Sequence, residues 1–156
     1  IIKCVYHLSY NISTMSRSTE AVRTILASII KTTNFGQCLK NLEIVSAGEG
    51  NCKAKLLLSN EHLNISGTLH GGFTSTLIDC VSSYALVTHK NGDPGSPGVS
   101  VDLHVSFMKA AYPGETLIID AKTIKAGKTM AFLAVDLTTN DGKNHIAHGR
   151  HTKFMK

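Results

Sequence analysis

HGGFTSTLIDCVSSYALVTH, residues 70–89, is the stretch that decides the fold. A helix this apolar is normally buried on most sides. We therefore predict one long helix at the centre of the domain. Its apolar side chains recur at helical spacing on one face, and Leu86 and Val87 widen the stripe formed by positions 73, 77, 80, 81, 84 and 85.

Strand-like segments follow this helix. The turn-rich residues 90–98 end it. We expect the strands beyond that point to form a meander, and Asn140-Asp141-Gly142 is a strong hairpin signal between the last two. The predicted strands are residues 99–108, 115–124, 129–139 and 143–153, with the other turns at Pro113-Gly114 and at residues 125–128.

A shorter helix and a hairpin are predicted before the central helix. Residues 17–33 have helical apolar spacing, with Ser18 or Thr19 as the candidate N-cap. Residues 41–58 indicate two strands. Because helices and strands are segregated, the predicted class is α+β, with an antiparallel sheet wrapped around one long central helix and a short N-terminal helix.

The length of 156 residues suits one domain. We assign it to residues 15–156 and interpret residues 1–14 as an upstream or non-native extension, since Met15 is a suitable start. No apolar run approaches the ~20 residues that span a bilayer, so we expect no stable membrane insertion. The four cysteines lack C-x-x-C spacing, which favours a reducing compartment and a cytoplasmic location, with the mitochondrion left open.

The net charge of +5 is unevenly distributed along the chain. Residues 101–156 contain eight Lys/Arg against five Asp/Glu. Such an excess suits nucleic acid, a membrane surface or a phosphorylated ligand. Nucleic acid is disfavoured because no aromatic residues interleave with the lysines.

Asp79 is the one formally charged residue between His62 and His89. Burial of an unpaired carboxylate is costly, so its presence on an apolar helix needs a reason. One interpretation is a general base or nucleophile whose pKa is set by apolar surroundings. The other is a structural residue that faces solvent or pairs with a distant lysine.

His70-Gly71-Gly72 leads into the same helix. The first N–H groups of a helix have no intrahelical partner and lie at its positive end. They can donate to a carbonyl oxygen that gains negative charge. The alternative is that the two glycines only loosen the entry into the helix.

The spacing between Gly71 and Asp79 limits how the two residues can act together. Asp79 lies eight residues after Gly71, which is ~12 Å along a helix axis. A base and an oxyanion donor must both lie within ~3 Å of the reacting groups. If both residues are catalytic, the enzyme is at least a dimer with composite sites.

Two segments resemble the hot-dog fold acyl-coenzyme A thioesterases: residues 62–79 (HLNISGTLHGGFTSTLID) and 98–111 (GVSVDLHVSFMKAA). The resemblance runs from about Met15 to Lys153 and implies hydrolysis of medium- to long-chain fatty acyl-coenzyme A. It also implies a homotetramer built as a dimer of dimers, with neither metal nor other cofactor. The fold itself does not fix the substrate.

The resemblance implies a role for each matching residue. The Gly71 N–H polarises the thioester carbonyl, with His70 and Asn64 organising that side. Asp79 of the facing subunit activates water or attacks directly. Ser100 holds the water, and Asp102 supports the site. Coenzyme A contacts two runs, Phe107, Met108, Lys109, Ala110 and Ala111, and Lys125, Ala126, Gly127, Lys128 and Thr129.

Two departures from the family pattern stand out. Residues 90–97 are a few residues longer than in the mammalian enzymes. Phe154 replaces a more polar residue near the nucleotide. These differences affect the loop before Ser100 and the last contact with the nucleotide, and they leave the implied catalytic residues unchanged.

Other signals carry less weight. His145 and His151 are expected on one face of a strand and His148 on the other, so they do not form a metal site. Ser82 and Ser83 lack a nucleophile elbow and are interpreted as small packing residues. Two other functions stay open: a module that binds acyl-coenzyme A without cleaving it, and a dehydratase or hydratase, which fits His70 less well.

Overall fold

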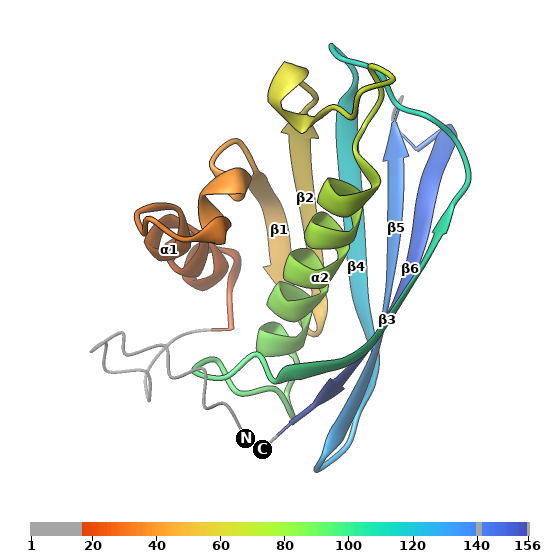
Figure 1. Cartoon of the computed structure of the whole chain (residues 1–156). Helices are drawn as coiled ribbons and strands as arrows, with labels where there is room; N and C mark the ends of the chain where they lie inside the picture. The colour runs from red at the N-terminus through yellow and green to blue at the C-terminus, as the bar shows by residue number, and fades with distance from the viewer. Residues whose placement is uncertain (1–16, 140–141, 156) are drawn as a thin grey trace.

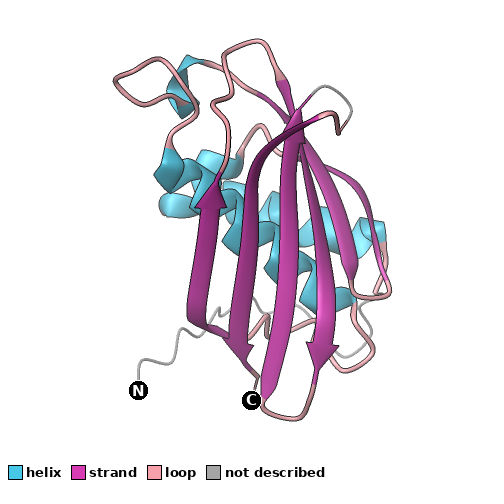
Figure 2. Cartoon of the chain, turned by 90° about the vertical axis from the view of Figure 1, so that its right-hand side faces the viewer, coloured by secondary structure: helices cyan, strands magenta, loops and turns pink. Residues whose placement is uncertain are grey.

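The computed structural model describes residues 17–139 and 142–155, and the extension expected over residues 1–14 lies outside these ranges. An antiparallel sheet curves around helix α2 (Figure 1), as predicted. Figure 2 shows the sheet from its other face, with the helices behind it. The elements are α1 (Thr19–Ile30), η2 (Phe35–Leu39), β1 (Glu43–Gly48), β2 (Asn51–Leu57), η3 (Asn60–His62), α2 (Gly71–Thr88), β3 (Val99–Phe107), β4 (Thr116–Ala126), β5 (Met130–Thr139) and β6 (Asn144–Phe154).

Helix α1 begins at the predicted cap. The Ser18 side chain accepts a hydrogen bond from the Ala21 N–H at 3.5 Å, which satisfies one donor of the first turn. Its apolar stripe buries Val22 and Leu26. The guanidinium of Arg23 donates to the Ile44 carbonyl at 3.0 Å, so α1 lies beside strand β1 at one margin of the sheet (Figure 1).

Helix α2 is buried as its composition predicts. Every residue from Val81 to Thr88 is buried, and so are Thr74, Leu77 and Ile78. The N-cap is His70, whose ring accepts the Gly72 N–H at 2.9 Å. Within the described ranges, no helix has both the length and the apolarity required to cross a bilayer.

The strand order differs from the expected meander. The order is β1-β2-β4-β5-β6-β3, so β4, β5 and β6 form a meander but β3 does not continue it. Strand β3 pairs with β6. The connection that follows β3 crosses to β4, which lies between β2 and β5 in the sheet. Long-range packing around α2 decides this pairing, whereas a turn such as Pro113-Gly114 reports only local geometry. Strand β3 is therefore a sheet edge, with Val99 and Val101 exposed.

Two bulges change which side chains face the helix. In β6, the register steps from Leu137↔Ala147 to Thr138↔His145, so one residue is extra. His145 is consequently exposed while His151 is buried, and the prediction that they share a face is wrong. In β3, the register steps from Ser100↔Lys153 to Asp102↔Thr152.

Gly149 allows β6 to approach α2 closely. A Cβ atom at this position would lie 2.4 Å from Cγ2 of Ile78, which is closer than carbon atoms can pack. A glycine is therefore required where the sheet touches the helix. This contact helps to place the inner face of β6, including His151 and Lys153, against the middle of α2.

Candidate active site

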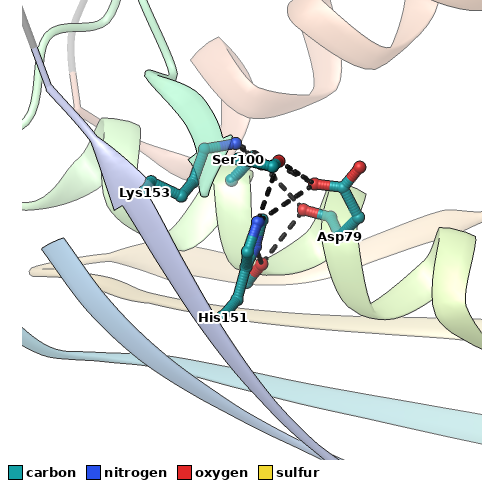
Figure 3. Close-up of polar contacts among 6 residues, drawn as sticks. Asp79, Ser100, His151 and Lys153 are labelled. Atoms are coloured by element: carbon teal, nitrogen blue, oxygen red, sulfur yellow. Dashed lines mark hydrogen bonds and ion pairs between the residues drawn. The ribbon is translucent and has the colours of Figure 1, made fainter. Parts of the chain in front are cut away.

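Asp79 lies in the middle of α2, where β3 and β6 converge on it (Figure 3). Its Oδ1 atom is 3.3 Å from Oγ of Ser100, 3.6 Å from Nε2 of His151 and 3.9 Å from Nζ of Lys153. Residues far apart in the sequence thus surround one carboxylate oxygen. Asp79 and Ser100, the residues predicted to activate and to hold the water, thus contact each other within one chain.

The surroundings of this carboxylate are polar, which corrects the expectation of apolar ones. The Asp79 side chain is 43% exposed in the single chain, and its neighbours are a hydroxyl, an imidazole and an ammonium group. Solvent exposure and pairing with a distant lysine, the two structural alternatives, are therefore both observed. Neither excludes catalysis, because a base must be ionised and reachable by water.

His151 is buried and joins α2 to β3. Its Nδ1 atom is 2.8 Å from Oγ of Ser82, and its Nε2 atom is 2.9 Å from Oγ of Ser100. Burial, with a smaller contribution from the charge of Lys153, lowers the pKa of His151 from 6.5 to about 4. The ring is therefore neutral near pH 7, and its 3.6 Å contact with Asp79 is not an ion pair.

The two serines after Asp79 are hydrogen-bonded rather than merely small. Both hydroxyls donate to the Asp79 carbonyl oxygen, Ser82 at 3.0 Å and Ser83 at 2.7 Å. Each also meets a side chain of β6, since Ser82 contacts His151 and Ser83 accepts from Nζ of Lys153 at 2.6 Å. Their interpretation as packing residues is incomplete.

Sequence reasoning missed His151 and Lys153 as site residues. The distance in sequence from Ser82 or Ser83 to these residues is about seventy positions, and no local pattern records such a contact. One feature of the β6 sequence could have indicated them. An imidazole and an ammonium group alternate on the inward face of a strand that otherwise buries small or apolar residues such as Ala147 and Gly149.

The N-terminus of α2 forms a second part of the candidate site. The His70 ring accepts the Gly72 N–H, and the His70 carbonyl accepts the Thr74 N–H at 2.9 Å. Gly71 lines a pocket of about 390 Å³, and its N–H belongs to the first turn, which has no intrahelical acceptor for it. A Cβ atom at Gly71 would lie 3.4 Å from the Phe107 ring, so a glycine leaves this approach open.

Asn64 organises the loop that leads to this helix. Its Oδ1 atom accepts the N–H of Ser66 at 2.9 Å and that of Thr68 at 3.3 Å, while its Nδ2 donates to Oγ1 of Thr68 at 3.0 Å. The side chain also lines the pocket beside Gly71. The structure therefore brings Asn64, His70 and Gly71 to one end of α2.

The predicted coenzyme A contacts fall into two separate places. Phe107, Met108, Lys109, Ala110 and Ala111 all line the pocket beside Gly71. Residues 125–129 instead comprise the last two residues of β4 and the turn into β5, at the other end of the sheet (Figure 1). Strand β4 separates the two groups by ten residue steps, or ~33 Å.

Asp102 does not join Asp79. The bulge at Val101 brings Ser100 and Asp102 to opposite faces of β3. Asp102 lines a different pocket, of about 550 Å³, with His104, His148 and Arg150 among its neighbours. Its negative charge still acts on His151, whose pKa it tends to raise against the larger effect of burial.

The histidines of β6 do not converge. His148 bonds to Asp136 at 2.8 Å on the outer face of the sheet, whereas His151 points to α2. Among the residues described, no group of three His, Cys, Asp or Glu side chains is placed to hold a metal ion.

Comparison with known proteins agrees with this fold. The family model described as "Thioesterase superfamily" matches residues 66–145, and the chain belongs to this superfamily of thioester hydrolases. It is 40% identical to acyl-coenzyme A thioesterase 13 of Homo sapiens over 141 residues, covering 90% of this chain and 99% of the relative.

Solved structures show the same architecture. Zebrafish thioesterase superfamily member 2 superposes with a TM-score of 0.84 at 36% identity, covering 92% of this chain and 100% of the other. A hypothetical thioesterase of Streptococcus pneumoniae, solved with coenzyme A, gives a TM-score of 0.68 at 26% identity, covering 75% of this chain and 87% of the other. The hot-dog fold predicted from residues 62–79 and 98–111 is thereby confirmed.

Proposed function

We propose that this protein hydrolyses medium- to long-chain fatty acyl-coenzyme A to free fatty acid and coenzyme A, at sites shared between two subunits. The observation that carries this proposal is the separation of the two half-sites. Asp79 lies eight residues, ~12 Å, beyond the Gly71 N–H on one helix and is not among the described residues that line the pocket beside Gly71. Two chains are required to bring both to one thioester.

The exposed edge strand β3 offers the surface for that second chain. Val99 and Val101 are 63% and 59% exposed on an edge with unpaired backbone groups, a feature that single domains normally avoid. Antiparallel pairing of two β3 edges reverses one chain relative to the other. Asp79 of one subunit then approaches the Gly71 end of its partner, and a dimer of such dimers gives the proposed tetramer.

The chemistry follows from these groups. Asp79 takes a proton from a water molecule held by Ser100 while the water oxygen attacks the thioester carbonyl carbon. The carbonyl oxygen gains negative charge and accepts the Gly71 N–H at the positive end of α2. Collapse of this intermediate breaks the carbon–sulfur bond, and the coenzyme A thiolate leaves and takes up the proton held by Asp79, which restores the base. No metal or other cofactor enters these steps.

The antiparallel arrangement of the two chains also accounts for the two separated groups of coenzyme A contacts. Residues 107–111 of one chain and the turn at 125–129 of another come together only across subunits. Lys125 and Lys128 supply positive charge for phosphate groups, which lysine meets as a point charge. The coenzyme A bound in the Streptococcus pneumoniae relative supports this ligand class. Three unpaired cysteines among the described residues, Cys38, Cys52 and Cys80, suit the proposed cytosolic or mitochondrial location.

The test is thiol release by purified protein from acyl-coenzyme A of increasing chain length. Wild-type protein is expected to release coenzyme A, most rapidly from medium to long chains. Asp79→Asn keeps the shape of the side chain and removes the base, so kcat/KM falls by about 10²- to 10⁴-fold. Binding without thiol release would favour a non-catalytic acyl-coenzyme A module, and an unchanged rate in Asp79→Asn would exclude the proposed mechanism.

A further inference from the structure

Lys153 is a buried lysine, and no step of the proposed reaction uses it. It is 3% exposed, near the end of β6. Lysine is rarely buried to this extent unless it is paired, because removal of an ammonium group from water is costly. Burial lowers the pKa of Lys153, and the opposing effect of Asp79 raises it. A buried ammonium group at this position therefore needs an explanation.

Its contacts reach Asp79 by two routes (Figure 3). Nζ lies 3.9 Å from Oδ1 of Asp79. Nζ also donates to Oγ of Ser83 at 2.6 Å, and that hydroxyl donates to the Asp79 carbonyl oxygen at 2.7 Å. Lys153 therefore contacts the Asp79 carboxylate directly and the Asp79 carbonyl group through Ser83.

The other titratable groups that face Lys153 are neutral near pH 7. Burial raises the pKa of the Cys80 thiol to about 12 and lowers the pKa of His151 to about 4. Of the groups placed against the ammonium in the described structure, Asp79 alone brings a negative charge. The two side chains differ in solvent exposure, since that of Lys153 is 4% exposed and that of Asp79 is 43% exposed.

This asymmetry matters when a substrate binds. The exposed side of Asp79 is the side that an acyl chain and a second subunit would cover. Loss of water disfavours a charged carboxylate, whereas a cation within ~4–6 Å favours it. Lys153 lies on the buried side of the carboxylate and stays in place when water leaves.

We propose that Lys153 is a positioning residue for the hydrolysis, which keeps the Asp79 carboxylate ionised and directed toward Ser100 after substrate has displaced solvent. It acts through Asp79 and does not touch the substrate. The inference rests on the proposed function of Asp79 as the base. A purely structural lysine would only tie the end of β6 to α2.

Four variants of the full chain separate these roles: Lys153→Met, Lys153→Arg, Asp79→Asn and the double variant Asp79→Asn/Lys153→Met. We expect Lys153→Met to lower kcat about tenfold or more at pH 6 with KM changed less than about threefold, and to move the acid limb of kcat about one unit toward higher pH. Lys153→Arg retains the charge and should restore most of the rate. In the Asp79→Asn background, Lys153→Met should cost nothing further.

Melting temperatures give a readout that does not depend on activity. Asp79→Asn removes the counterion of a buried cation and should lower Tm, and adding Lys153→Met should recover part of that loss. A wild-type kcat and pH profile in Lys153→Met would overturn the inference, as would an equal loss of rate with and without Asp79. Failure of the proposed function looks different, because wild-type protein would then release no coenzyme A while the melting cycle still reports the Asp79–Lys153 coupling.

Discussion

Oγ of Ser100 lies 2.9 Å from Nε2 of His151, whose other ring nitrogen is 2.8 Å from Ser82. The imidazole thus holds the hydroxyl of an edge strand in place beside Asp79. The Ser100 hydroxyl also donates to Oδ1 of Asp79 at 3.3 Å. The water site in the proposed reaction therefore depends on a buried histidine.

Replacement of His151 should impair turnover through Ser100. We expect His151→Phe to lower kcat by about tenfold or more, because buried polar networks lose more than one contact when a member is removed. Ser100→Ala should give a similar loss, and the double variant should lose little beyond either single variant. Steady-state thiol release measures all three. Fully additive losses would show that His151 acts independently of Ser100.

Stability should respond to pH through the same ring. The pKa of His151 is about 4 in the folded chain against 6.5 for a free side chain, so the unfolded chain binds more protons between these values. The free energy of unfolding then falls as pH is lowered from about 6.5 toward about 4. Urea unfolding at pH 7, 6 and 5 should show a smaller fall for His151→Phe than for wild type. Parallel curves would refute a neutral buried His151.

Close contact between β6 and α2 predicts a cost at Gly149. Gly149→Ala would place a Cβ atom 2.4 Å from Cγ2 of Ile78, so the strand or helix must shift, at about 1–3 kcal/mol of unfolding free energy. Gly48→Ala is the matched control, because its nearest heavy atom would be 4.0 Å away. Chemical denaturation compares the two, and equal stability would argue against tight packing here.

The turn between β4 and β5 should affect substrate affinity. Lys125→Gln and Lys128→Gln are expected to raise KM several-fold with little change in kcat, and the effect should shrink in high salt because exposed charges are screened within ~10 Å at 0.1 M. Lys55→Gln is the control, since Lys55 pairs with Glu43 at 3.0 Å on the outer surface. An equal effect of all three would indicate general attraction rather than a phosphate site.

Much of the fold is predictable from local signals. Capping at Ser18, the apolar stripe of residues 70–89 and the turn residues around 90–98 each act within a few positions. Strand pairing is different, because β3 joins β6 through contacts that depend on where α2 packs. The sequence pattern could not distinguish that arrangement from a simple meander.

The candidate site also contains residues that local sequence predicts and residues that only long-range packing brings together. Gly71, His70 and Asn64 lie within one short stretch of sequence, and the structure places them at the N-terminal end of α2. His151 and Lys153 reach Asp79 only because Gly149 allows β6 to approach α2, and bulges at Ile146 and Val101 reset the faces of their strands. Alternation in sequence cannot locate a bulge that long-range packing imposes.

In the proposed mechanism, each site takes Asp79 from one subunit and the Gly71 N–H from the other. Co-expression of Asp79→Asn with Gly71→Pro, which removes that N–H, forms mixed dimers with one intact site. A random mixture should then regain about a quarter of wild-type activity although each parent is nearly inactive. Gel filtration and melting curves confirm that both parents fold and assemble. If the mixture is no more active than its parents, both groups belong to a single chain and the shared site is wrong.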